Sequence, residues 1–146
     1  MVVTLNEAIE YYTPRIDVGI AWLKSVRKGR WEKGIDLNNL KMSHGCNCIC
    51  GQAFVKEAAK ACQIDGFDWA ARRLTGGHYY GGYGGTAEYG FFRGPFHEVK
   101  MPNGTIENSW TVLGDLWAER IKTERRRIKK NLIRGSHSRV VQTSTI

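Results

Sequence analysis

The chain has 146 residues, of which 42% are hydrophobic and 25% are charged, a balance that suits one globular domain and excludes a disordered chain. No apolar run approaches the roughly 18–20 residues that a helix needs to cross a bilayer, and the N-terminus lacks the pattern of a secretory signal, so we expect a cytosolic protein with no membrane partner. Four cysteines are too few for a disulfide scaffold.

Helical patterns begin at the N-terminus. Thr4 and Glu7 have the spacing of a capping box, which predicts a short helix to about Tyr12. Pro14 cannot continue that helix without losing a hydrogen bond, so a second helix is predicted to start there and to end near Gly29.

Two further helices are expected in the middle of the chain, over residues 47–62 and after a cap at Asp65. Residues 76–94 then hold eight of the seventeen glycines and four of the six tyrosines. Because glycine at this density disfavours the interiors of helices and strands, we predict a long Gly/Tyr loop, pinned to the body by its aromatic side chains.

A hairpin and a helix are predicted in the last third of the chain. Asn103-Gly104 lies between two short alternating runs, residues 96–101 and 105–107, which is a strong signal for a β-hairpin. Asn108 or Ser109 then caps a final helix.

The apolar face of that final helix thins beyond Ile121, so we expect the helix to project from the body there. The predicted fold is therefore of the α+β class and mainly helical, with four or five helices and one small β-hairpin. Residues 1–122 should form a single globular domain, and residues 123–146 a basic C-terminal helix extension and tail.

The net charge of +8 is concentrated near the C-terminus, where residues 119–134 hold eight cations and two anions. A helix with this many cations attracts phosphates and releases their counterions, and the forked arginine side chain suits phosphate oxygens, so contact with nucleic acid is predicted. A solvated helix, or one that docks on an acidic protein, stays an alternative. The residues expected to contact nucleic acid are Arg120, Lys122, Arg125, Arg126, Arg127, Lys129 and Lys130.

Three of the four cysteines alternate along a short stretch that follows His44. Together with His44, the residues Cys46, Cys48 and Cys50 have the ligand atoms of a zinc site, but structural zinc sites usually separate paired cysteines by roughly two to four residues. Free cysteines are commonly buried. Small buried thiols without a cofactor are therefore expected, with bound zinc or a redox disulfide as the alternatives.

The sequence points to no enzyme activity. His78 or His97 could serve a catalytic cysteine as a base across space, but nothing in the sequence selects either one. The chain has no phosphate-cradling glycine loop, no His-Glu-x-x-His and no Gly-x-Ser-x-Gly.

The stretch from Cys46 to Gln52 has the form Cys-x-Cys-x-x-Gly-Gln. With Trp22-Leu23, the Ile-Asp-Leu segment at 35–37, Tyr89-Gly90-Phe91 and a C-terminal helix around Trp117, it resembles a family of small uncharacterised proteins of phages that infect actinobacteria. The resemblance implies a phage origin and a shared fold, and it implies no chemistry. Cys50, the Gly/Tyr loop and the hairpin depart from the family pattern.

These observations predict a small non-enzymatic phage accessory protein of the host cytoplasm that contacts nucleic acid through its basic C-terminal helix. The alternative is a protein-interaction module that binds a host protein, or a virion component, through the Gly/Tyr loop and the hairpin.

Overall fold

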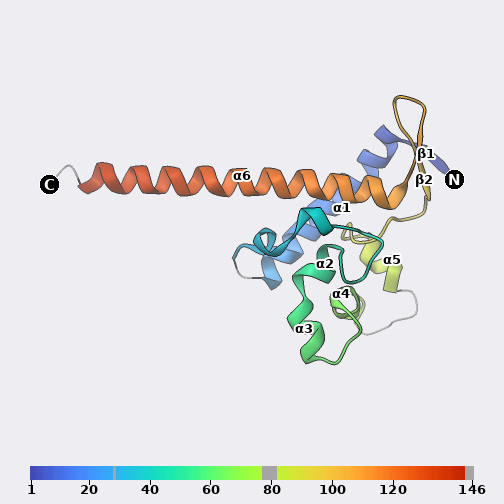
Figure 1. Cartoon of the computed structure of the whole chain (residues 1–146), viewed down its shortest axis with the longest axis horizontal. Coiled ribbons are helices and arrows are strands. Elements are labelled where there is room, and N and C mark those ends of the chain that lie inside the picture. Colours follow the sequence, from blue (N-terminus) through green and yellow to red (C-terminus); the bar gives the residue numbers. More distant parts are fainter. Residues whose placement is uncertain (28, 77–81, 144–146) are drawn as a thin grey trace.

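The computed structural model describes residues 1–27, 29–76 and 82–143, and it describes their side chains except in 82–84 and 136–143. Figure 1 shows a body of short elements gathered around helix α1 (Leu5–Val26) and the first part of helix α6 (Ser109–Thr143), which then runs on alone. The predicted class, α+β and mainly helical, is confirmed. Within the described ranges, no helix combines the length and apolarity that a membrane span requires.

Helix α1 passes through Pro14 without a break, so the prediction of two separate helices is wrong. The predicted capping box is present, with the Thr4 hydroxyl oxygen accepting a 3.2 Å hydrogen bond from the Glu7 amide. Proline removes one backbone hydrogen bond from a helix. Burial of a single apolar stripe that continues on both sides of exposed Pro14 offsets this loss. The buried residues of α1 are Ala8, Tyr12, Ile16, Gly19, Ile20 and Leu23.

The two long helices approach closely at Gly19. A Cβ atom there would lie 3.2 Å from the Trp117 ring of α6 and would clash with the Tyr89 carbonyl oxygen. Trp117 is fully buried, and its indole N–H donates a 2.7 Å hydrogen bond to the Gly90 carbonyl oxygen. The close contact between Gly19 and the Trp117 ring sets the position of α6 against α1.

The helix predicted over residues 47–62 is instead two short helices, α2 (Ile49–Ala53) and α3 (Val55–Lys60), which meet at Phe54. The Arg27 side chain takes the Ala53 carbonyl oxygen as a hydrogen-bond acceptor. Phe54 is fully buried and stacks on Trp69, with ring centroids 4.6 Å apart. Long-range packing of Phe54 therefore overrides the local helical pattern.

The segments beside these helices are short. Two 3-10 helices precede them, η1 (Trp31–Gly34) and η2 (Leu37–Asn39). Helix α4 (Gly66–Leu74) begins at the predicted cap, where the Asp65 carboxylate accepts a 2.8 Å hydrogen bond from the Asp68 amide.

Part of the predicted Gly/Tyr loop is helical, as α5 (Gly82–Ala87), while residues 77–81 lie outside the described ranges. Small residues allow α5 to lie close to the end of α4, since a Cβ at Gly85 would come within 2.9 Å of the Thr75 methyl group. The expected aromatic anchoring is visible at Tyr89 and Phe91, which contact Trp22 of α1.

The predicted hairpin is confirmed as β2 (Glu98–Lys100) and β3 (Ile106–Asn108), which pair antiparallel with Val99 opposite Glu107. A third strand, β1 (Val2–Thr4), pairs parallel with β2 and completes the sheet order β1-β2-β3. Three residues give too short a pattern to predict β1 from the sequence.

Candidate nucleic-acid interface

Helix α6 begins at the sheet and ends far from it. The Asn108 carboxamide oxygen accepts a 2.8 Å hydrogen bond from the Trp110 amide and caps the helix start. Of the predicted apolar face, Leu113, Trp117 and Ile121 are buried and Trp110 and Leu116 are partly buried. Leu132 and Ile133 are more than half exposed. The expected projection of the helix from the body is confirmed (Figure 1).

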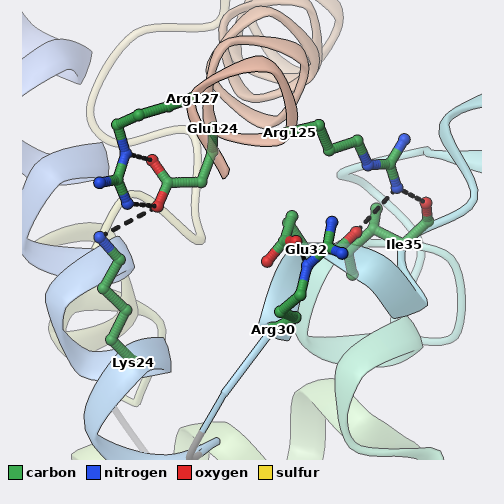
Figure 2. Close-up of polar contacts among 7 residues, drawn as sticks. All are labelled: Lys24, Arg30, Glu32, Ile35, Glu124, Arg125 and Arg127. Carbon is green, nitrogen blue, oxygen red and sulfur yellow. Dashed lines mark hydrogen bonds and ion pairs between the residues drawn. The ribbon is translucent and has the colours of Figure 1, made fainter. Parts of the chain in front are cut away.

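Arg125 holds α6 at the point where it leaves the body, as Figure 2 shows. One guanidinium nitrogen of Arg125 donates hydrogen bonds of 2.7 Å to the Glu32 carbonyl oxygen and 2.6 Å to that of Ile35. Both carbonyl groups lie in or directly after η1. Arg125 was predicted to contact nucleic acid, but in this structure it docks the helix onto the body.

A second contact at this point involves Glu124. Its carboxylate accepts a 2.7 Å hydrogen bond from Arg127 and forms a 3.1 Å ion pair with Lys24 of α1 (Figure 2). Hydrogen bonding from Arg127, and then from Lys24, lowers the pKa of Glu124 below its ordinary value of 4.5. The positive charge of Arg127 is therefore partly neutralised within the chain.

Two more of the predicted residues also have partners. Arg120 forms a 2.5 Å ion pair with Asp17 of α1. Lys122 pairs with Glu119 at 3.4 Å, and because both side chains are more than half exposed this pair is weak.

The remaining predicted residues, Arg126, Lys129 and Lys130, point into solvent. Within the described part of the chain, the side chain of Arg126 reaches only Thr123 of its own helix, at 3.2 Å, and the two lysines have no polar partner. Arg134 was not among the predicted residues, although it was counted in the charge, and it is equally exposed.

These exposed cations share one side of α6. A helix turns by about 100° per residue, so Lys122, Arg126 and Lys130 follow each other closely around the axis, with Lys129 and Arg134 to either side of that line. Trp117 and Ile121, which face the body, lie on the opposite side. We call this set, Lys122, Arg126, Lys129, Lys130 and Arg134, the outer face of α6.

The candidate zinc ligands do not converge. Cys48 and Cys50 are buried, whereas Cys46 and His44 are exposed. The Cys48 sulfur caps α2 by accepting a 3.3 Å hydrogen bond from the Gly51 amide. Among the residues that the structure describes, no group of three or more His, Cys, Asp or Glu side chains has the arrangement of a metal site.

The chemistry of the two buried thiols agrees with this geometry. Burial raises the pKa of the Cys48 thiol from 9.0 to about 12, and burial also raises the pKa of Cys50 well above 9.0. The thiolate is the form that binds zinc and attacks disulfides, so both side chains favour the inert thiol. All four cysteines are free.

The Gly-Gln part of the same motif joins two segments of the body. A Cβ at Gly51 would clash with backbone atoms of Gly45 and lie 2.5 Å from those of Cys46. Gln52 donates a 2.9 Å hydrogen bond to the Asn47 carbonyl oxygen and accepts a 2.6 Å hydrogen bond from the Asp36 amide. These contacts give the motif a structural role.

The structure describes only part of the other two predicted binding surfaces, the hairpin and the Gly/Tyr loop. Residues 102–105 of the hairpin turn are exposed, and His97 beside it is exposed as well. His78 and the centre of the Gly/Tyr loop lie outside the described residues, so binding of a protein through that loop stays a prediction.

The outer face of α6 is thus the strongest cationic feature that the structure brings together, and the origin of the chain stays a prediction from resemblance. Comparisons with protein-family models, with curated proteins and with solved structures found no match.

Proposed function

We propose that this protein binds nucleic acid through the outer face of α6 and acts as a small non-enzymatic phage accessory protein in the host cytoplasm. The observation that carries the proposal is the division of the cations of α6 into two groups. Arg120, Arg125 and Arg127 contact carboxylates or carbonyl oxygens of the protein itself. Among the described residues, no carboxylate pairs with the outer-face cations Arg126, Lys129, Lys130 and Arg134. Lys122 has only its weak pair with Glu119, so these cations are left for an external anion.

The spacing of the outer face suits a nucleic-acid backbone. From Arg126 to Arg134 the helix rises by roughly 12 Å. A strand of duplex DNA presents one phosphate about every 3.4 Å along the axis, so the same length holds three or four phosphates. Side chains that reach phosphates read little sequence, so binding should be mainly electrostatic and weakly sequence-specific.

The test is a fluorescence anisotropy titration of labelled duplex DNA with the full chain at several salt concentrations, from roughly 50 to 200 mM. The test variant carries Arg126→Gln, Lys129→Gln and Lys130→Gln. The matched control carries Lys41→Gln, Lys60→Gln and Lys100→Gln, which remove the same charge from exposed positions of the body. Circular dichroism verifies that α6 is intact in both.

Each lost phosphate contact should reduce the slope of log affinity against log salt by about 0.9, so the test variant should lose roughly 2 to 3 units of slope. The control should keep most of the slope of the wild-type chain. Equal losses in the two variants would show that net charge alone attracts DNA, and the proposal would then be wrong.

Substitution is a sharper test than truncation after Ile121. Truncation there would also remove Glu124 and Arg125, which contact Lys24 and Ile35 of the body. A loss of binding would then mix lost phosphate contacts with a loosened fold.

A further inference from the structure

A second cationic feature lies at the C-terminal end of α1, away from the outer face of α6. It is a cavity of about 270 Å³, formed where α1 and η1 meet α2 and α3. A buried water needs only about 10–15 Å³ on a comparable measure, so the cavity has room for a hydrated anion. Three cationic side chains line it: Arg27, Arg30 and Lys56.

Two of these cations are held in place by carboxylates. Arg30 donates through its Nε atom to Glu32, at 2.7 Å, and Arg27 donates through one Nη atom to Glu57, at 3.2 Å. The carboxylates neutralise part of the charge but occupy only one nitrogen of each guanidinium group. The other guanidinium nitrogens have no acceptor within the described ranges.

Lys56 adds an unpaired charge. Its side chain is exposed and, within the described part of the chain, forms no hydrogen bond or ion pair. An ammonium group beside two partly free guanidinium groups is a donor set that suits the oxygens of a phosphate.

One residue that lines the cavity also carries a buried donor without a partner. Trp31 lines the cavity, is only 4% exposed, and has an indole N–H that is buried with no hydrogen-bond acceptor among the described residues. Buried polar groups in folded proteins nearly always have a partner, and an unpaired one calls for an explanation such as a bound ion or water.

We propose that this cavity is a binding site for a phosphate group, held by Arg27, Arg30 and Lys56 beside the Trp31 indole. Free inorganic phosphate and a phosphate of a nucleic-acid backbone share this chemistry. The site is separate from the outer face of α6, so it does not depend on the function proposed above.

The test follows the indole N–H resonance of Trp31 by NMR in the full ¹⁵N-labelled chain, assigned with a Trp31→Phe variant, while inorganic phosphate is added. Sodium chloride at matched ionic strength is the control for screening. We expect phosphate, and not chloride, to shift the Trp31 resonance with saturation. Equal effects of the two salts would overturn the proposal.

Lys56→Gln should weaken phosphate binding by about fivefold to tenfold, because a charge-assisted contact is lost. Lys60→Gln, which removes an exposed cation from the same helix α3 outside the cavity, should leave the affinity unchanged. Arg30→Gln should also weaken binding, but it leaves buried Glu32 without its ion pair, so Lys56→Gln is the deciding variant. Unchanged affinity in Lys56→Gln would show that the proposal is wrong.

Duplex DNA then distinguishes the two sources of phosphate. A shift of Trp31 with DNA would assign the site to backbone phosphates, and a shift with inorganic phosphate alone would assign it to free phosphate. The triple variant of the outer face should keep its response to inorganic phosphate, so a failure of the nucleic-acid function would leave this result intact.

Discussion

The guanidinium group of Arg125 donates a 2.6 Å hydrogen bond to the backbone carbonyl oxygen of Ile35, which lies 90 residues earlier in the chain. The most basic run of the sequence therefore contributes one of its arginines to the fold. Its neighbour Arg126, one residue further on, faces solvent. Two adjacent and chemically identical side chains thus lie in different environments.

Substitution of these two arginines should give opposite patterns. Arg125→Ala removes two hydrogen bonds from a charged donor to carbonyl groups, so the free energy of unfolding should fall by about 1–3 kcal/mol. Arg126→Ala removes an exposed side chain and should change that free energy by less than about 0.5 kcal/mol. Urea denaturation followed by circular dichroism measures both values.

DNA affinity of the same two variants provides the cross-check. Arg126→Ala should reduce the salt dependence of binding, whereas Arg125→Ala should leave it near that of the wild-type chain wherever the variant is folded. If Arg125→Ala lost as much salt dependence as Arg126→Ala while remaining stable, Arg125 would be a phosphate contact and its docking role would be secondary.

Glu124 makes the docking of α6 sensitive to acid. Its pKa is lowered in the folded state, chiefly by the hydrogen bond from Arg127, so its ion pairs stabilise the fold above the ordinary pKa of 4.5. That stabilisation is lost as the pH falls through the lowered pKa of the folded state, because the carboxylate then takes up a proton. The free energy of unfolding should therefore decrease as the pH falls below 4.5.

Glu124→Gln tests this linkage. At about pH 7 the variant should unfold more easily than the wild-type chain by roughly 0.2–1 kcal/mol, as is typical of ion pairs near a surface, and at about pH 2 the difference should shrink. Glu119→Gln is the matched control, since Glu119 is two-thirds exposed and, among the described residues, its side chain pairs only with Lys122. A difference for Glu124→Gln that stays constant with pH would mean that the carboxylate charge does not stabilise the fold.

The features that were predictable from the sequence depend on neighbours a few residues apart. The capping box at Thr4, the cap at Asp65 and the hairpin around Asn103-Gly104 each complete their hydrogen bonds locally, so a short pattern contains the required information. The same holds for the apolar face of α6 up to Ile121.

The features that were not predictable depend on residues far apart in the chain. Strand β1 exists because it pairs with β2, and α1 continues past Pro14 because its stripe is covered over its whole length. At the candidate site, the sequence shows eight cations but not their partners, since Asp17, Lys24 and Ile35 come from the first quarter of the chain. Charge counting therefore indicates the helix but cannot separate its docking side from its outer face.

The four cysteines should divide into two reactive and two unreactive thiols. Cys46 and Cys62 are exposed, whereas Cys48 and Cys50 are about 1% exposed and have raised pKa values. Because the thiolate is the attacking form, a disulfide reagent such as Ellman's reagent at about pH 8 should modify two thiols rapidly in the folded chain and all four in denaturant.

A double variant, Cys46→Ser with Cys62→Ser, should abolish the rapid phase and leave only reaction through unfolding.

The rate at which Cys46 reacts with the same reagent also tests for zinc binding. If Cys46, Cys48 and Cys50 jointly bound the metal, added zinc would protect Cys46 and slow its reaction, because a coordinated thiolate is a poorer nucleophile. With Cys48 committed to capping α2 through the Gly51 amide, we expect zinc to leave the rapid phase unchanged. Protection of Cys46 by one equivalent of zinc would instead require Cys48 to leave the cap, and the start of α2 would then depend on metal.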